Sequence, residues 1–426
     1  MKIPHRILAT GAVVAVAAMA LAACSGGASS TTPSPSSSGE ISGTVTGIFD
    51  AQYKDAVEPI VTAFEKKYPD VKVNFNYQGG DLSGAILTQL QAGTAPDILL
   101  TFPGGNANDS SDNVVPLANA GLIAPIEADW AGDVPDTWKS SVFFNDKLYS
   151  SPGALQPLAA MYNQSLLDEL GLKVPTTLDE VMQLCTDAKD KGVYAYAQGL
   201  GDAAAGPQML SFGQTASLIY GADPTWDQGL ATGKVTYPGS GWQTQFEIYQ
   251  NMFKAGCFGD GALGRSRVQG QEAVAKRQAL GLVDVGAVLA GIHASNAKDK
   301  FLVSAIPATN DGKNSISALP GYVLTANAAA KNLAAAKAFV AFAGEPDQSA
   351  AYATGFGSVP LIPNPNFKPP AELADFNKLV IDGQTAPLAN LQPEVQTALN
   401  TGVQSMLLGK DTPATVAQKM QDAYKK

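Results

Sequence analysis

The sequence predicts an α/β protein whose folded part begins with a doubly wound parallel sheet. Between residues 45 and 102, three strand-like segments are separated by two segments with apolar residues at helical spacing. With right-handed crossovers, this order gives a parallel sheet whose first strand most economically lies between the other two. The length of 426 residues adds a prediction of two domains, at roughly 100–200 residues per domain.

Each of the five segments has its own signature. A short strand ends at residues 45–49, and apolar residues then repeat at helical spacing over 56–64. Residues 71–77 alternate apolar and polar side chains, as a half-buried strand does. A second helical pattern covers 82–90, and 97–102 is an apolar run suited to a buried parallel strand.

The sheet also predicts where a ligand would bind. In doubly wound sheets the ligand crevice lies outside the carboxyl ends of the strands, at the point where the strand order reverses. Here that point lies between the first and third strands, so residues 49–53 and 102–105 are the candidate ligand-contacting segments.

Further helices are marked by their ends. Thr177 with Glu180 forms a capping-box signature at the start of a helix that holds Cys185. Residues 242–255 read as a helix with Gly256 at the position after its C-cap. Thr412 followed by Pro413 marks the start of the last helix.

Composition excludes several classes of protein. The chain has 28 Lys and Arg against 38 Asp and Glu, and removing a predicted signal at 1–23, which holds Lys2 and Arg6, leaves 26 − 38 = −12. Such a field repels polyphosphate, which argues against a nucleic-acid partner. The counts of Gly (42), Pro (27) and Cys (3) exclude collagen-like, disordered and knottin-like chains.

The N-terminus predicts export and anchoring. Lys2 and Arg6 precede an apolar run at 7–23 that is too short for an ordinary membrane span. The end of the run, Leu21-Ala22-Ala23-Cys24, resembles the bacterial lipobox, in which Cys24 would be diacylated and become the mature N-terminus. The alternative is an ordinary secretory signal with an incidental cysteine. Residues 25–40 would form a flexible tether with a reach of roughly 20–25 Å.

Two cysteines remain after Cys24. Outside the cytoplasmic membrane Cys185 and Cys257 would meet an oxidising environment, which favours a disulfide. The alternative is two buried free thiols, because Cys185 lies on the apolar face of its helix.

Catalytic and cofactor motifs are incomplete. His293 is the one histidine after the signal, and no G-x-S-x-G elbow accompanies it, so a nucleophilic triad and a histidine-cysteine metal site are unsupported. Residues 229–235 fail the phosphate-loop pattern, 199–204 have no strong strand before them as a dinucleotide fingerprint requires, and Leu117 stands where a calcium loop needs Glu. We therefore expect no cofactor and no metal. Glycoside hydrolysis needs only two carboxylates, so the composition does not exclude it, but the spacing of the 38 Asp and Glu does not identify such a pair.

Several segments stand in a characteristic order. They are FEKKYPDVKV at 64–73, QAGTAPDI at 91–98, KLY at 147–149 with MYNQSLL at 161–167 and VPTTLDE at 174–180, PGYVL at 320–324, and AAAKAFVAF at 334–342 with GSVP at 357–360. Together they resemble the extracellular solute-binding proteins of ABC importers, in the carbohydrate-binding family that includes maltose-binding protein. The resemblance covers nearly all of 41–426.

The resemblance implies a type II periplasmic-binding-protein-like fold, in which two α/β lobes, each a doubly wound sheet with helices on both faces, are joined by a hinge. One lobe would be 41–152 plus 321–366, and the other 153–320 plus 367–426. A sugar would enter the cleft, the lobes would close, and a membrane permease would read the closed form of a monomer without enzymatic activity. The rivals are a binding protein for a non-sugar solute, such as a peptide or polyamine, and a secreted carbohydrate-active enzyme.

The resemblance also implies the ligand-binding residues. A pyranose has apolar faces and a hydroxyl rim, so such sites combine aromatic rings with polar side chains. Carried over, the site comprises Phe49, Asp50, Gln52, Tyr53, Gly80, Asp81, Phe102, Gly104, Gln156, Gly199, Gly201, Asp284, Gly286, Gly321, Tyr322 and Phe356. Each of these aromatic residues could equally belong to the core.

The sequence departs from the maltose-binding pattern. Val288 and Gln396 stand where cleft tryptophans are found, which indicates a smaller or more polar solute than long malto-oligosaccharides. Three arginines follow the signal, Arg265, Arg267 and Arg277, and none of them falls at a predicted cleft position. Phosphate-bearing ligands are therefore disfavoured.

Overall fold

The computed structural model describes residues 41–425 except 79–82, 106, 108–110 and 203–205. Residues 41–426 form one compact unit. The predicted signal, Cys24 and the tether lie outside the described residues.

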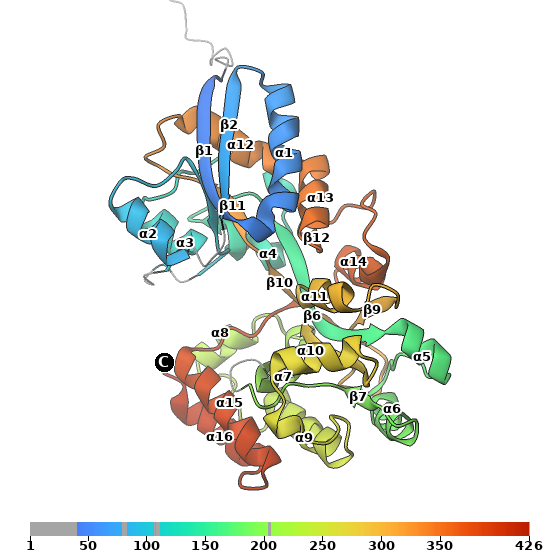
Figure 1. Cartoon of the computed structure of the whole chain (residues 1–426). Helices are drawn as coiled ribbons and strands as arrows, with labels where there is room; N and C mark the ends of the chain where they lie inside the picture. Colours follow the sequence, from blue (N-terminus) through green and yellow to red (C-terminus); the bar gives the residue numbers. More distant parts are fainter. Residues whose placement is uncertain (1–40, 79–82, 106, 108–110, 203–205, 426) are drawn as a thin grey trace, which may run out of the picture. The chain divides into compact units, whose positions relative to one another are not determined.

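The first sheet has the order β11-β3-β1-β2 (Figure 1). Its strands are β1 (Gly43–Asp50), β2 (Val71–Gln78), β3 (Ile98–Thr101) and β11 (Val323–Ala326). β1 pairs in parallel with both β2 and β3, so the predicted central place of the first strand is confirmed. β11 adds an antiparallel strand beside β3 from far along the chain, which makes the sheet mixed.

Helices cover both faces of this sheet (Figure 1). α1 (Lys54–Lys67), α12 (Leu333–Ala343) and α13 (Pro346–Gly355) share one core with Val45 and Phe49 of β1. On the other face, α2 (Ser83–Gln91) and α3 (Val114–Asn119) enclose Leu99 and Val323. Burial of both faces explains why β3 is an uninterrupted apolar run rather than an alternating one.

The second sheet is built on β6 (Ala154–Asn163), in which all ten residues are buried. β8 (Ala279–Val285) and β10 (Ile316–Pro320) flank it antiparallel, β7 (Tyr194–Tyr196) runs parallel to β8, and β13 (Thr385–Pro387) runs parallel to β10. β9 (Phe301–Ser304) and β12 (Val359–Pro360) also pair with β6. The four strands β7, β8, β10 and β13 therefore all end at the same edge of the sheet.

The remaining elements surround these sheets. They are α4 (Asp136–Val142), β4 (Phe143–Phe144), β5 (Lys147–Leu148), α5 (Gln164–Leu170), α6 (Leu178–Asp190), α7 (Gly206–Thr215), α8 (Trp226–Ala231), α9 (Gly241–Lys254), α10 (Arg267–Ala275), α11 (Val288–Ser295), α14 (Ala374–Ile381), α15 (Pro393–Leu407) and α16 (Pro413–Ala423). The predicted N-caps are confirmed: the hydroxyls of Thr177 and Thr412 accept hydrogen bonds from backbone N–H groups of the first turn. The capping box expected at Thr177 is not formed, because the Glu180 carboxylate accepts from the N–H and hydroxyl of Thr176 instead. Gly256 follows α9 with φ +79°.

Two short crossovers join the sheets where their parallel strands end. Residue 153 leads into β6, and residues 321–322 connect the end of β10 to the start of β11. The backbone N–H of Gly321 donates to the carbonyl of Ala154 at 2.8 Å. Gly153 has φ +72°, and a Cβ there would lie 2.7 Å from Cγ1 of Val323. The carboxyl edge of each sheet, meaning the edge where its parallel strands end, therefore adjoins that of the other.

A disulfide joins Cys185 in α6 to Cys257 after α9, with Cα atoms 4.6 Å apart. Both residues are buried in the core under the second sheet. The bond links α6 to the segment after α9, and its two cysteines are 72 positions apart in the sequence.

We expect no free thiol from Cys185 or Cys257 when the exported Cys24→Ser protein is denatured without reductant. Prior reduction should release two thiols per chain and lower the unfolding midpoint, because the unfolded chain then gains freedom. Thiol titration and thermal unfolding measure these effects. Two thiols without reductant would contradict the bridge.

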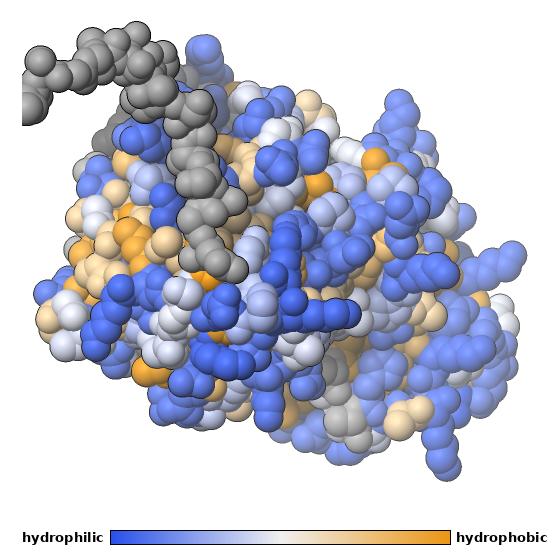
Figure 2. Space-filling view, turned by 90° about the horizontal axis from the view of Figure 1, so that it is seen from above, coloured by the Kyte–Doolittle hydropathy of each residue, from blue (hydrophilic) through white to orange (hydrophobic). Residues whose placement is uncertain are grey.

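The face drawn in Figure 2 is largely hydrophilic, with apolar residues in small groups. In the described part of the chain, no helix has both the length and the apolarity to cross a membrane.

Candidate functional site

Four of the predicted ligand-binding rings lie together beside the crossovers. The ring of Tyr322 lies edge-on to those of Phe102, at 4.4 Å between centroids, and Tyr53, at 5.5 Å. Tyr53 stacks on Phe356 with centroids 5.4 Å apart and planes inclined by 16°. We call Tyr53, Phe102, Tyr322 and Phe356 the aromatic cluster. The aromatic cluster is partly exposed and partly buried: Phe102 is 39 % exposed, whereas Tyr53 is only 5 % exposed.

Each ring of the aromatic cluster comes from the end of a different element. Tyr53 ends a 3₁₀ turn after β1, Phe102 follows β3, and Phe356 is the C-cap of α13. Tyr322 lies in the crossover between β10 and β11. The hydroxyl of Tyr352 donates to the carbonyl of Tyr322 at 2.7 Å, which fixes the backbone of that crossover.

Polar groups adjoin the aromatic cluster. Gln156 on β6 is 9 % exposed, and a Cβ on Gly321 would lie 3.4 Å from the Nε2 atom of Gln156. Burial, together with nearby Tyr322 and Asp50, raises the pKa of the Tyr53 phenol above its ordinary value. The Tyr53 hydroxyl therefore stays protonated and remains a hydrogen-bond donor at neutral pH.

Phe49 is not part of this group, contrary to expectation. Its side chain is fully buried and packs edge-on against Phe75, with centroids 4.8 Å apart. Phe49 lies on the same face of β1 as Val45, toward α1 and α12, so it belongs to the core. The nearby Gly47 leaves room for these rings, since a Cβ there would lie 2.9 Å from the Phe49 ring.

Three of the predicted glycines have a packing requirement of their own. A Cβ on Gly199 would lie 2.7 Å from the backbone of Arg267, and one on Gly201 would lie 2.8 Å from that of Gly264. A Cβ on Gly286 would lie 2.8 Å from the ring of Pro157. Each glycine therefore allows two parts of the chain to approach closely.

Gly104 serves the backbone of its own loop. It adopts φ +66°, and its N–H donates to the carbonyl of Ser141 at 2.7 Å, so this donor is already in use. Other predicted positions cannot be placed: Gly80, Asp81 and Cys24 lie outside the described residues, as does the side chain of Gln52.

Asp284 has a partner that the sequence analysis missed. Its carboxylate is buried at the end of β8 and accepts hydrogen bonds from Nε of Arg267, at 2.8 Å, and from Nη2. The backbone N–H of Val285 donates to the same carboxylate at 2.7 Å. Arg267 is not itself one of the predicted cleft positions, but its guanidinium pairs with Asp284, which is one. Only the Ser266 and Gln269 capping box, which starts α10 at Arg267, was visible in the sequence.

The hydrogen bond to Asp284 raises the pKa of Arg267, burial of the guanidinium opposes this rise, and the charges of Asp284 and Asp202 add to it. Arg267 is therefore a fixed cation at the carboxyl edge of the second sheet.

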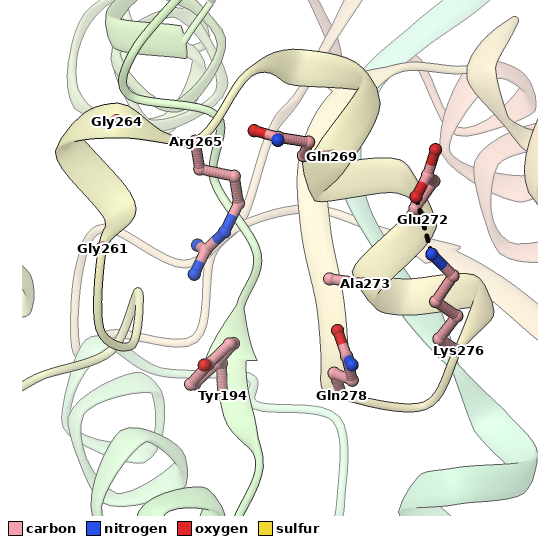
Figure 3. Close-up of a pocket in the computed structure, with 9 residues that line it drawn as sticks. All are labelled: Tyr194, Gly261, Gly264, Arg265, Gln269, Glu272, Ala273, Lys276 and Gln278. Carbon is pink, nitrogen blue, oxygen red and sulfur yellow. Dashed lines mark hydrogen bonds and ion pairs between the residues drawn. The ribbon is translucent and has the colours of Figure 1, made fainter.

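A separate hollow of about 370 Å³ lies between α10, the loop that precedes it and Tyr194 of β7 (Figure 3). The Arg265 side chain points into it, with its guanidinium 5.0 Å from the centroid of the Tyr194 ring. Arg265 donates to the carbonyls of Phe258, at 2.7 Å, and Asp260, at 3.0 Å, so it mainly holds the loop before α10. Within the described residues, no group of three or more His, Cys, Asp or Glu could hold a metal ion.

The chain belongs to the bacterial extracellular solute-binding protein family, whose model matches residues 50–350. A maltooligosaccharide ABC transporter solute-binding lipoprotein of Streptococcus pneumoniae is 29 % identical over 187 residues, which are 43 % of this chain and 40 % of that protein. The chain thus aligns with less than half of that relative. A putative binding protein of Brucella abortus is 24 % identical over 90 % of this chain and 92 % of its own length.

Solved structures show the same two-lobe type II fold. The apo form of RafE from Streptococcus pneumoniae superimposes with a TM-score of 0.73 at 19 % identity, over 91 % of this chain and 99 % of RafE. A family 1 extracellular solute-binding protein from Bifidobacterium longum subsp. infantis gives 0.70 at 21 % identity, over 90 % and 98 %. The resemblance recognised in the sequence and the predicted fold class are therefore confirmed.

Proposed function

We propose that this protein is the sugar-binding receptor of an ABC importer, anchored to the extracytoplasmic face of the cell membrane by a lipid on Cys24. It binds a mono- or short oligosaccharide between its lobes as a monomer, closes by a hinge, and delivers the sugar to the permease. We place the lobes at 41–152 plus 321–366 and at 153–320 plus 367–426.

The observation that carries this proposal is the aromatic cluster beside the two adjoining carboxyl edges. Ligands of α/β sheets bind outside the carboxyl ends of strands, and here both sheets direct those ends toward the crossovers. Phe102 offers a partly exposed ring for the apolar face of a pyranose, and Gln156 and Tyr53 offer polar groups for its hydroxyls. The relatives add support, because one is a maltooligosaccharide ABC transporter solute-binding lipoprotein and RafE has been solved in complex with raffinose.

Calorimetry on the refolded mature protein tests the proposal, since refolding removes any ligand carried from the host. We expect saturable binding of at least one neutral sugar among raffinose, stachyose, maltotriose and xylotriose. Putrescine and a tripeptide mixture test the alternative of a non-sugar solute. Binding of either of these, without any sugar, would contradict the proposal.

The enzyme alternative has its own test. Overnight incubation with the bound sugar should return it unchanged, because a receptor has no reaction to catalyse. Chromatography of the incubated sugar measures this. Released products would identify a carbohydrate-active enzyme instead.

Anchoring gives a further prediction. Cys24→Ser should move nearly all of the protein from the membrane fraction to the medium or buffer, because no diacylated residue remains. Cell fractionation with immunoblotting measures the shift, and Ser25→Ala serves as the matched control. A Cys24→Ser protein that stays on the membrane, with its signal cleaved, would refute the lipid anchor.

A further inference from the structure

Arg267 lies at the carboxyl edge of the second sheet, which is one of the two edges beside which the proposed sugar site lies. Its backbone packs over Gly199 in the loop after β7, and its guanidinium holds Asp284 at the end of β8. Both strands end at the edge that adjoins the crossovers and Tyr322. The Arg267 side chain is one-third exposed, at 33 %, whereas that of Asp284 is only 2 % exposed.

The pairing leaves part of the guanidinium available. Asp284 occupies Nε and one N–H of Nη2, and within the part of the chain that the structure describes no hydrogen bond involves Nη1. The next residue, Val268, is 61 % exposed, so solvent reaches this turn of α10. A buried carboxylate therefore holds a rigid, planar donor that is one-third exposed and keeps N–H groups free for a ligand.

The charges around Arg267 point to the kind of ligand. Asp284 cancels the charge of the guanidinium, and Asp202 is close enough to act on it with a second negative charge. The net charge around Arg267 is thus negative rather than positive, and it would repel an anionic group of a ligand. A hydroxyl oxygen accepts from an arginine N–H without this penalty.

We propose that Arg267 is a specificity-determining residue of the sugar site, which donates from Nη1 to hydroxyl oxygens of an uncharged sugar while Asp284 fixes it and cancels its charge. The pair selects neutral sugars against uronates and sugar phosphates. This inference rests on the proposed function and deepens it.

The test compares refolded wild-type protein with Arg267→Lys by calorimetry, using the neutral sugar of the panel that binds most tightly. Lysine keeps a cation beside Asp284, so the fold is retained, but it has no second nitrogen to donate to a ligand while the first pairs with Asp284. We expect Kd to rise by about 10- to 150-fold, the range for a hydrogen bond to a charged group. Arg277→Lys is the matched control, because Arg277 is similarly exposed, at 37 %, and pairs with Glu169 and Asp299 instead.

Two further variants of the Arg267 and Asp284 pair test the same role. Arg267→Met combined with Asp284→Asn removes both charges together, so no unpaired carboxylate is left buried, and it should lose affinity to the same degree. Asp284→Asn alone should improve the ratio of galacturonate to galactose affinity by about tenfold, because the net charge around Arg267 is then less negative.

The outcomes distinguish a failure of the proposed role of Arg267 from a failure of the proposed function. Wild-type binding of a neutral sugar with weakened binding by Arg267→Lys supports the role of Arg267. The same wild-type binding with Kd unchanged within twofold in Arg267→Lys overturns that role and leaves the proposed function standing. Tighter wild-type binding of galacturonate or glucose 1-phosphate than of every neutral sugar overturns the selectivity. Failure of the wild type to bind any sugar overturns both.

Discussion

Replacing Phe102 or Tyr322 by alanine is expected to weaken sugar binding by about 5- to 150-fold while the fold survives. Each ring would lose its contact with the sugar face, which is worth roughly 1–3 kcal/mol. Phe102 is 39 % exposed without ligand, so its removal uncovers little of the core. The Tyr322 carbonyl that accepts from Tyr352 belongs to the backbone and remains in Tyr322→Ala.

The measurement is a pair of values for each variant, the Kd from calorimetry and the midpoint of thermal unfolding. Leu408→Ala is the control for removing an exposed apolar side chain, because Leu408 is 57 % exposed at the end of α15. It should change neither value. Unchanged affinity with a large fall in midpoint would mean that Phe102 and Tyr322 pack the structure rather than recognise a ligand.

Replacing Phe49 by alanine should have the opposite pattern. Its ring is fully buried and contacts Phe75 and Tyr77, so its loss leaves a cavity in the core and lowers the free energy of unfolding by about 3–5 kcal/mol. Affinity of the folded protein for sugar should stay within about twofold, because no ring surface reaches the ligand.

Denaturant unfolding of Phe49→Ala, followed by calorimetry at a temperature where it is folded, checks both statements. Phe102→Ala is the matched comparison, since the same residue type is removed beside the same sheet. A Phe49→Ala protein of normal stability with lost affinity would return Phe49 to the binding site.

Phe49 and Phe102 show how much of the binding site can be predicted from the sequence. Both residues follow the strand pattern at the predicted crevice, and both fit a ligand platform equally well. The difference is the direction of one side chain: Phe49 continues the core-facing row of Val45, whereas Phe102 lies just past the end of β3. Periodicity locates the end of a strand to within a residue or two, which is too coarse to decide this.

The glycines illustrate a second limit. The family resemblance placed Gly199 and Gly286 at the ligand site. Each of them also allows a close approach within the protein, to the backbone of Arg267 in one case and to the ring of Pro157 in the other. Residue type alone does not say which partner uses the space.

By itself the sequence determined the local and periodic features of this protein. The order of strands and helices to residue 102, the caps at Thr177 and Thr412 and the family follow from patterns that neighbouring residues carry. The tertiary structure decided what depends on residues far apart in the chain. β11 joins β3 across more than 220 positions, four rings from separate elements form the aromatic cluster, and Arg267 reaches Asp284 between two strand ends. Such contacts form only when the crossovers bring the carboxyl edges of both sheets together, and local spacing does not encode that meeting.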